Sequence, residues 1–590
     1  MRKLAVYLKG YERESVLAPL FKMLEAFFDL LVPVVVARII NVGITGTDRG
    51  YIARWFGVLL LLAAVGFASS VTAQFFAARA SVGFAAKLRQ ALFDHVQSLS
   101  CTELDTLGTN TLITRMTSDI NQVQNGYNMA LRLLLRSPFI VFGSMIMAFM
   151  IDVKSALVFV VAIPVLSLVV FGIMLASIPL FARAQASLDG LLGKTRENLT
   201  GVRVIRAFCK EEAEVSEFDG RNAALTRMNL LVGRLSALMN PATYVLINIA
   251  TIVLLRTGAV QVDGGAIRQG DVVALYNYMA QMIIELVKLA SLIITINKAL
   301  ACADRVGEVL AVEPGMTYPA ATEASAAGAA DAAPAVRFEH VTLRYSGAGA
   351  PSLTDLSFDV PRGQTVGIIG GTGSGKSSVV NLIPRFYDAT EGSVQVAGRD
   401  VRTYPEGALI RRIGIVPQKA VLFEGTIAEN LRWGNENATD EQLWRALDIA
   451  QAREVAEGKE GGLSFRIEQN GRNLSGGQRQ RLTIARALVR EPEILIMDDS
   501  ASALDFATDL KLRRAIAALP GAMTVFIVSQ RSASIRGADQ ILVLDDGKLA
   551  GRGTHEELLD GCSVYREIYY SQFPEERKDG GAQDAGEVPA

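Results

Sequence analysis

Apolar residues are concentrated before Ala311, in stretches long enough to cross a lipid bilayer. Half of the 590 residues are hydrophobic and the mean hydropathy is positive, which is too apolar for an ordinary soluble protein. The sequence predicts six membrane helices, at residues 16–41, 55–78, 129–151, 155–180, 238–258 and 271–297. The second–third and fourth–fifth connections are long, charged and rich in helix-forming residues, whereas the other connections are short. This part of the chain is therefore predicted to be an all-α membrane domain.

A glycine-rich loop at residues 370–377 predicts a phosphate-binding site. The apolar residues 366–369 before it read as a buried strand, and residues 378–382 after it open a helix. In this context backbone N–H groups and the helix N-terminus can surround phosphates, Lys376 can reach the outer ones, and Ser377 can ligate magnesium. The alternative is a glycine-rich turn without a ligand. The predicted nucleotide-binding residues are Gly370, Gly371, Thr372, Gly373, Ser374, Gly375, Lys376, Ser377 and Ser378.

Two further segments complete this pattern. Residues 474–478 read Leu-Ser-Gly-Gly-Gln and are followed by a basic helical run. About twenty residues on, an apolar strand ends in Asp498, the expected magnesium partner. With these segments, residues 336–573 resemble the ATPase domain of the ATP-binding-cassette (ABC) family, whose signature is this LSGGQ sequence.

The resemblance implies roles for further residues. Tyr345 matches an aromatic residue that stacks on adenine, although a cross-strand core aromatic is the alternative. Gln418 matches a glutamine that senses magnesium and the membrane domain, and Asp505 matches a loop that crosses to a partner cassette. In the family each ATP lies between the phosphate loop of one ATPase domain and the signature of another. The signature residues expected to face the partner's ATP are Ser475, Gly476, Gly477 and Gln478.

Two positions depart from the family pattern. Efficiently hydrolysing members have a glutamate where this chain has Asp499, and a histidine where it has Gln530. An aspartate carboxylate falls short by about 1 Å, and misplacement on that scale costs on the order of 10²-fold in rate. A glutamine can donate a hydrogen bond but cannot carry the charge of an imidazolium. The three histidines of the chain, His95, His340 and His555, lie elsewhere. The resemblance therefore predicts a site that binds ATP and Mg²⁺ but hydrolyses ATP poorly.

The membrane helices resemble the exporter-type membrane domain of the same family. Residues 112–119 resemble the segment after the first bend that contacts the ATPase, and residues 197–211 resemble the approach to the second; amphipathic cytoplasmic coil is the alternative. The predicted fold is a multidomain membrane protein, in which an all-α six-helix transmembrane domain precedes an α/β P-loop ATPase domain. The predicted boundaries are 1–312 for the membrane domain, 313–335 for a linker, 336–573 for the ATPase and 574–590 for a disordered tail.

Charged residues inside the spans require an explanation because charges are costly in lipid. Lys22, Glu25 and Asp29 recur at helical spacing, as do Glu285 and Lys288 in the sixth span. The resemblance places parts of the sixth helix along the transport path, so Glu285 and Lys288 are candidates for substrate contact. An internal ion pair that fixes helix register is the alternative.

An even number of spans with a C-terminal ATPase predicts that both termini are cytoplasmic, in a multi-pass protein of the cell membrane. The basic residues Arg2, Lys3 and Lys9 agree with the positive-inside rule. The first span is expected to serve as an uncleaved anchor. The four cysteines all map to the cytoplasmic side, which predicts no disulfides. The formal charge of −1 argues against a nucleic-acid partner.

A chain with one phosphate loop and one signature must pair with a second half-transporter. Because the signature is intact and the hydrolytic positions are not, we expect a heterodimer with a hydrolytically competent partner. The alternatives are a homodimeric transporter with slow turnover and an ATP-gated channel or regulatory subunit. The membrane domain leaves the substrate open among drugs, lipids, peptides and imported chelates.

Overall fold

The computed structural model describes residues 2–319, 333–500, 502–519, 521 and 523–577, and divides into two compact units. The membrane unit comprises Met1–Gln97 and Thr109–Val312, and the ATPase unit comprises Ser98–Gly108 and Glu313–Ala590. The short helix α3 (Cys101–Leu107) thus belongs to the ATPase unit, where Tyr387 Oη donates to Asp105 Oδ2 over 2.6 Å. The predicted boundary at 312 therefore separates the units except at residues 98–108.

The membrane unit contains six long apolar helical segments, which confirms the predicted number of spans. They are Glu12–Ile44, Arg49–Ser98, Thr109–Ile151, Val153–Thr200, Glu211–Asp263 and Gln269–Leu310. Each predicted span lies inside one of them. The helices continue well past the apolar stretches; α2 (Arg49–Ser98) has 50 residues, which is roughly 75 Å at about 1.5 Å per residue. Since a hydrocarbon core is about 30 Å thick, most of such a helix lies outside it.

The six segments are built from the following elements: α1 (Glu12–Arg38) with the π-helical turn η2 (Ile39–Ile44), α2, α4 (Thr109–Thr114), η3 (Arg115–Asp119), α5 (Ile120–Leu133), α6 (Arg136–Ile151), α7 (Val153–Thr200), α9 (Glu211–Ala237), α10 (Met239–Asp263) and α11 (Gln269–Leu310). Helix α11 packs on α1, α5 and α6, and its fully buried Tyr278 donates from Oη to the Leu30 carbonyl oxygen over 2.5 Å.

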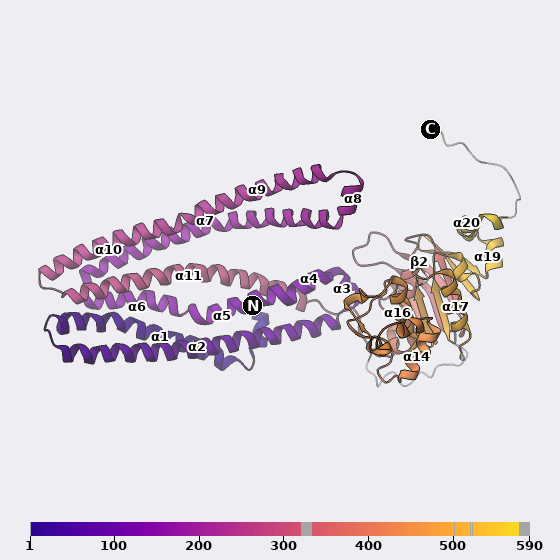
Figure 1. Cartoon of the computed structure of the whole chain (residues 1–590), viewed down its shortest axis with the longest axis horizontal. Helices are drawn as coiled ribbons and strands as arrows, with labels where there is room; N and C mark the ends of the chain where they lie inside the picture. Colours follow the sequence, from indigo (N-terminus) through magenta and orange to yellow (C-terminus); the bar gives the residue numbers. More distant parts are fainter. Residues whose placement is uncertain (1, 320–332, 501, 520, 522, 578–590) are drawn as a thin grey trace. The chain divides into compact units, whose positions relative to one another are not determined.

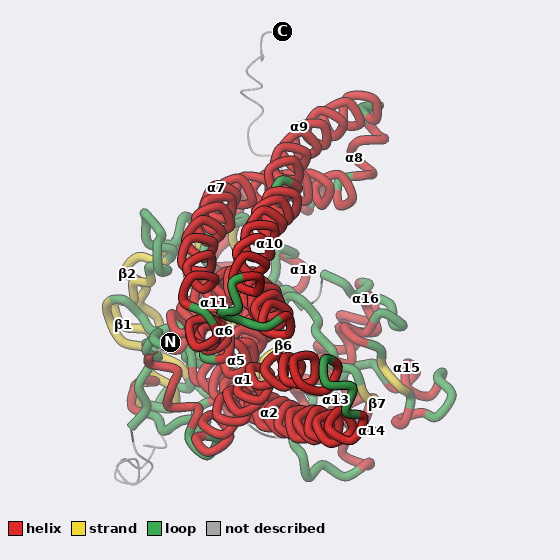
Figure 2. The backbone as a smooth tube through the Cα atoms, turned by 90° about the vertical axis from the view of Figure 1, so that its left-hand side faces the viewer, coloured by secondary structure: helices red, strands yellow, loops and turns green. Residues whose placement is uncertain are grey.

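Helices α7 and α9 form a long hairpin whose bend is the short helix α8 (Val202–Ala207) (Figures 1 and 2). Lys194 Nζ on α7 pairs with the carboxylates of Glu214 (2.8 Å) and Glu217 (3.2 Å) on α9. Around α8 the side chains of Val204 and Phe208 are exposed. The connection between the fourth and fifth spans, which the sequence predicts to be charged and helix-forming, is thus a helical hairpin with exposed apolar side chains at its tip.

The ATPase unit contains a six-stranded sheet in the order β12-β11-β3-β10-β9-β6. Its strands are β3 (Thr365–Gly370), β6 (Ile413–Val416), β9 (Ile494–Asp498), β10 (Thr524–Val528), β11 (Gln540–Asp545) and β12 (Lys548–Gly553). All neighbours pair in parallel except β11 and β12. Parallel strands are covered on both faces, which is why β9 and β10 are near-continuous apolar runs. Their carboxyl ends lie at one edge, where open α/β sheets bind ligands.

Besides α3, two smaller sheets and nine α-helices accompany this sheet among the described residues. The antiparallel sheet β2-β1-β4-β5 consists of β1 (Val336–Leu343), β2 (Leu353–Val360), β4 (Glu391–Val396) and β5 (Arg399–Asp400), and β7 (Gly425–Thr426) pairs with β8 (Arg466–Ile467). The helices are α12 (Lys376–Leu382), α13 (Ile427–Arg432), α14 (Asp440–Ile449), α15 (Arg453–Glu457), α16 (Gly476–Leu488), α17 (Phe506–Ala517), α18 (Ser532–Ile535), α19 (His555–Gly561) and α20 (Ser563–Gln572).

The predicted disordered tail requires a correction at its start. Pro574–Glu576 forms a 3₁₀ turn, because Glu576 accepts a hydrogen bond from Tyr569 Oη over 2.5 Å and pairs with Arg536 at 3.4 Å. The remaining tail from residue 578, and residues 320–332 of the predicted linker, lie outside the described residues.

Candidate nucleotide site

The phosphate loop connects β3 to α12, as its sequence predicts, and its shape depends on glycine. Gly375 has a φ of 92°, in the left-handed region that favours glycine. A Cβ at Gly375 would lie 2.6 Å from Leu353 Cδ2 and 2.8 Å from the Ser352 carbonyl oxygen. The loop therefore curls against the start of β2, which no side chain at this position would permit.

Lys376 lies across this loop. Its Nζ donates to the carbonyl oxygens of Gly370 (2.9 Å) and Gly371 (2.6 Å). Burial lowers the pKa of the Lys376 amine, and the nearby carboxylates of Asp499 and Asp498 oppose that shift. The lysine is thus a buried cation at the loop, as a phosphate ligand requires.

A pocket of about 280 Å³ brings most of the predicted residues together. It is lined by Ser352, Thr372, Gly373, Gly375, Lys376, Ser377, Ser378, Gln418, Asp498, Asp499, Val528, Ser529 and Gln530. Gly370, Gly371 and Ser374 lie behind it, as partners of Lys376. Sequence reasoning missed Ser352, Val528 and Ser529. Ser352 carries no motif, whereas Val528 and Ser529 end the strand before Gln530 and could have been inferred from it.

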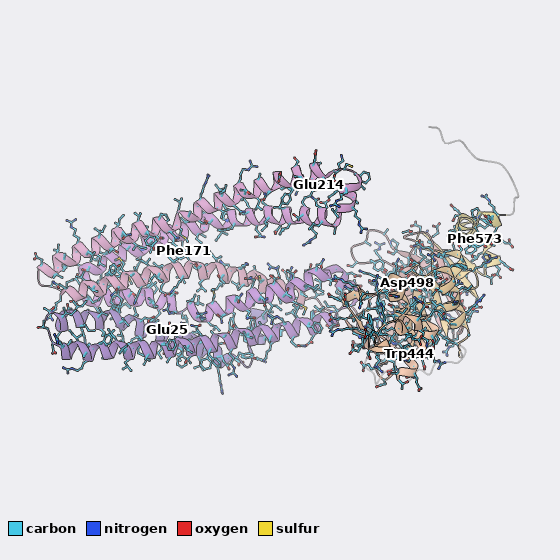
Figure 3. The ribbon with its side chains drawn as sticks, in the orientation of Figure 1. Glu25, Phe171, Glu214, Trp444, Asp498 and Phe573 are labelled. Carbon is cyan, nitrogen blue, oxygen red and sulfur yellow. The ribbon has the colours of Figure 1, made fainter. Side chains whose placement is uncertain are left out.

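The residues predicted to hold magnesium fit that ion. Ser377 Oγ donates to Asp498 Oδ1 over 3.1 Å at the carboxyl end of β9, and Gln418 lines the same pocket (Figure 3). Burial raises the pKa of Asp498, so a cation beside it would be favourable. A hydroxyl and one carboxylate beside nucleotide phosphates are typical of Mg²⁺ sites.

The two departing positions, Asp499 and Gln530, face this same pocket. Asp499 has a φ of 44°, and its backbone is held on both sides. Its N–H donates to the Val528 carbonyl oxygen over 3.0 Å, and its carbonyl oxygen accepts from Ser502 Oγ over 2.8 Å. Among the described residues, the lining contains no histidine.

The signature and the inter-domain loop are helix caps in this chain. The Ser475 and Gln478 side chains form a capping box at the start of α16, with the Gln478 N–H donating to Ser475 Oγ over 3.3 Å. Asp505 caps α17 by accepting from the Thr508 N–H over 2.9 Å, and this bond holds the pKa of Asp505 below its usual value. At both caps, backbone N–H groups at the start of the helix lie near polar loops. Such N–H groups are suited to bind an anion.

Tyr345 lies beside the phosphate loop. Its Oη donates to Ser378 Oγ over 3.0 Å, and its ring meets that of Tyr387 edge-on at 5.0 Å. The ring is half-buried, so part of its surface is available for stacking.

Charged residues at Glu285, Lys288, Arg136 and Asp29 form a network across three helices of the membrane unit. Glu285 on α11 is 3% exposed and accepts from Arg136 (2.6 Å), Lys288 (2.9 Å) and Ser137 (2.7 Å). Arg136 also pairs with Asp29 on α1 at 3.1 Å. Sequence reasoning did not include Arg136, because it lies at the start of α6, outside the helical spacing of the other charges.

Lys22 and Glu25 extend this network along α1 (Figure 3). Their side chains pair at 2.5 Å, and Lys22 Nζ also donates to Ser70 Oγ on α2 over 3.1 Å. The ion pair expected within each helix is therefore present, and Arg136 joins the two.

Comparison with known proteins agrees with this architecture. A family model described as the ABC transporter transmembrane region matches residues 15–286, and one described as ABC transporter matches residues 353–502. The chain is 36% identical over 569 residues to an uncharacterized ABC transporter ATP-binding protein of Mycobacterium tuberculosis, covering 96% of this chain and 97% of the relative. This chain belongs to the ABC transporter family. The ABC transporter YfiB of Bacillus subtilis is 35% identical, covering 98% of this chain and 99% of YfiB.

Two further similarities concern transport. This ABC transporter is 33% identical to a probable multidrug resistance ABC transporter of Bacillus subtilis, covering 84% of each chain. Its fold matches the structure of a bacterial Atm1-family ABC exporter with ATP bound, with a TM-score of 0.77, 22% identity, and coverage of 97% of this chain and all of the other. The protein is thus a multi-pass ABC transporter in which a membrane domain is fused to an ATP-hydrolysing domain.

Proposed function

We propose that this chain is the subunit of a heterodimeric ABC exporter that carries the degenerate ATP site. The observation that carries the proposal is that Asp499 and Gln530 line the same pocket as Lys376 and Asp498. The residues that bind nucleotide and the two residues that differ from the family pattern therefore act on one nucleotide. The pocket retains what binds phosphate and Mg²⁺, and lacks the two groups that efficient family members use for hydrolysis.

The backbone at Asp499 argues against compensation for its shorter side chain. A backbone shift that moves the carboxylate forward by about 1 Å would disturb the hydrogen bonds that the Asp499 N–H and carbonyl oxygen make with Val528 and Ser502. A carboxylate that does not reach the attacking water gives little of the roughly 10²–10⁴-fold that general-base assistance contributes. Gln530 can still donate a neutral hydrogen bond toward a phosphate oxygen, but it adds no positive charge. ATP in this pocket would consequently be held and turned over slowly.

In the proposed cycle the partner performs the fast hydrolysis. Water attacks the γ-phosphorus of ATP at the partner's phosphate loop, the partner's glutamate accepts the proton, and ADP leaves. Ser475, Gly476 and Gly477 of this chain close that site at the start of α16, where the helix N–H groups favour phosphate oxygens. In each site the bound Mg²⁺ would neutralise phosphate charge, and here Ser377, Asp498 and Gln418 would hold it.

The exposed bend at α8 also offers a surface for docking on a partner subunit. Val204 and Phe208 are exposed there, with Arg203 directly before Val204 and Arg206 between the two. Apolar side chains flanked by arginines are typical of interface anchors. In the ATPase unit, a pocket has an aromatic wall and three carboxylates against two guanidinium groups; its lining includes Glu424, Glu460, Phe465, Arg466, Glu468 and Arg472. We propose that such a bend of each half docks on the ATPase domain of the other.

Transport would follow from differential stability of two membrane-domain states. ATP at both sites would favour the outward-open state, and hydrolysis at the partner's site would reset it. On the substrate path, Lys288 is the more accessible of the two candidates, with a side chain 46% exposed, against 4% for Glu285. We propose that Lys288 contacts substrate and that Glu285 orients it.

The proposal is tested by ATP hydrolysis of the purified chain without its partner. It should bind ATP and show little ATPase activity, and Asp499→Glu should restore activity only in part because Gln530 remains. The double variant Asp499→Glu/Gln530→His should restore more, on the order of 10²-fold or above. A wild-type turnover equal to that of the double variant would refute the degenerate site and favour the homodimer.

A further inference from the structure

The backbone at Gln530, which stands where efficient family members have a histidine and is called the switch position below, is held by the side chain of Gln572. Gln572, the last residue of α20, donates from Nε2 to the Gln530 carbonyl oxygen over 2.8 Å. Its Oε1 accepts from the Ser532 N–H, also over 2.8 Å. A single amide thus satisfies a backbone acceptor and a backbone donor on either side of Arg531, about forty residues away in sequence.

Helix α20 is a rigid support for this amide. Tyr565 and Tyr569, one helical turn apart, are 0% and 1% exposed. Tyr569 also packs on Phe573 at 5.0 Å, directly after Gln572. Figure 3 labels Phe573 at this end of the ATPase unit. The amide therefore projects from a buried, well-packed base rather than from a loose terminus.

The switch loop has a second support on its other side. The Arg531 N–H donates to Ser529 Oγ over 2.9 Å, and the Arg531 guanidinium reaches the carbonyl oxygens of Leu504 and Ser502 at 3.4 Å. Those carbonyls belong to the loop that leads to Asp505. With Gln572, these bonds hold the loop at residues 529–532 between α20 and the segment after β9.

We propose that Gln572 is a positioning residue for the switch: it fixes the Gln530 backbone so that the Gln530 side chain faces the terminal phosphate. The proposal rests on the proposed ATP site. A neutral amide forms a hydrogen bond about half as strong as a charged donor does, and such a bond weakens steeply when its angle is poor. A chain with glutamine at the switch position consequently depends on a fixed backbone. Gln572 therefore determines how well this site distinguishes ATP from ADP.

The test uses one variant that removes one of the two Gln572 hydrogen bonds and a second variant that removes both. Gln572→Glu keeps an acceptor for the Ser532 N–H and loses the donor to the Gln530 carbonyl, with almost no change of shape. Gln572→Leu loses both bonds. Glu567→Gln, on the exposed face of the same helix, is the matched control. Lys376→Ala reports on the nucleotide site itself.

The measurement is the affinity of the purified full-length chain for fluorescent trinitrophenyl-ATP and trinitrophenyl-ADP with Mg²⁺. Gln572→Leu should weaken the ATP analogue about 3- to 10-fold, as expected for loss of one or two hydrogen bonds. The ADP analogue should change by less than about 2-fold, because it lacks the phosphate that the switch contacts. Gln572→Glu should lie between Gln572→Leu and the wild type, and Glu567→Gln should match the wild type.

The two proposals fail in different ways. If Lys376→Ala leaves binding of both analogues unchanged, the pocket is not the ATP site and the proposed function falls. If Lys376→Ala weakens binding but Gln572→Leu and Gln572→Glu leave the ATP/ADP ratio unchanged, the positioning role is overturned. An equal loss for ATP and ADP in both Gln572 variants would also overturn it, since that would be a general structural effect.

Discussion

Replacing Arg136 by methionine should destabilise the membrane unit more than a typical substitution in the first turn of a helix does. Its guanidinium pairs with Glu285 at 2.6 Å and with Asp29 at 3.1 Å, and its side chain is 12% exposed. Methionine fills similar volume but leaves the Glu285 carboxylate, 4% exposed, without its closest cation. Breaking a buried ion pair costs about 3–5 kcal/mol, and the lower end, about 3 kcal/mol, applies because Lys288 and Ser137 remain bound.

For a unit of about 300 residues, with an unfolding entropy of about 2.1 cal/mol/K per residue, about 3 kcal/mol corresponds to a fall in Tm of roughly 5 °C. The assay is thermal unfolding of the detergent-solubilised chain, followed by tryptophan fluorescence. Arg54→Met, at an exposed arginine of α2, is the matched control and should change Tm by less than about 2 °C. The double variant Arg136→Met/Glu285→Gln should recover more than half of the loss, because no buried charge is then unpaired. A double variant as unstable as Arg136→Met would show that the network does not depend on charge pairing.

Two further predictions concern the ATPase unit. In the proposed heterodimer, Ser475→Arg should remove most ATPase activity, because we propose that Ser475 closes the partner's competent site, whereas Lys376→Ala should be milder; a larger loss from Lys376→Ala would reverse the assignment of the two sites. Burial and the Arg536 charge lower the pKa of His555, so the folded state favours neutral histidine. As the pH falls below about 6.5, the unfolded state binds more protons, and stability should decline until the lowered folded pKa is passed. His555→Gln should flatten that decline in thermal unfolding between pH 7 and pH 5, and an unchanged slope would assign it to other groups.

The nucleotide site could be predicted from the sequence because its chemistry is carried by contiguous residues. Lys376 and Ser377 follow the glycine loop after one apolar strand, Asp498 ends another, and parallel strands of one sheet bring their carboxyl ends to the same edge. The departures at Asp499 and Gln530 were visible for the same reason. Ser352 was not, since its place in the pocket depends on how β2 packs against the loop.

The six spans were also evident locally, because twenty apolar residues in a row have few other uses in a protein. The extensions of these helices beyond the apolar stretches were less clear. The α7–α9 hairpin is charged and only weakly amphipathic, and it is defined by pairs such as Lys194 with Glu214 that join residues twenty apart. Helix propensity alone indicates helix there, but not which helix it packs against.

The sequence by itself determined the family, the order of the domains, the phosphate loop and the two altered catalytic positions. Only the tertiary structure decided that Arg136 joins α1 to α11, that the Asp499 N–H is held by Val528, and that the Gln572 side chain holds the backbone on both sides of Arg531. The physical reason is how far apart along the chain the contacting residues lie. A motif is read from neighbours along the chain, whereas these contacts join residues separated by about 30 to 150 positions, and depend on which face of each helix or loop packs inward.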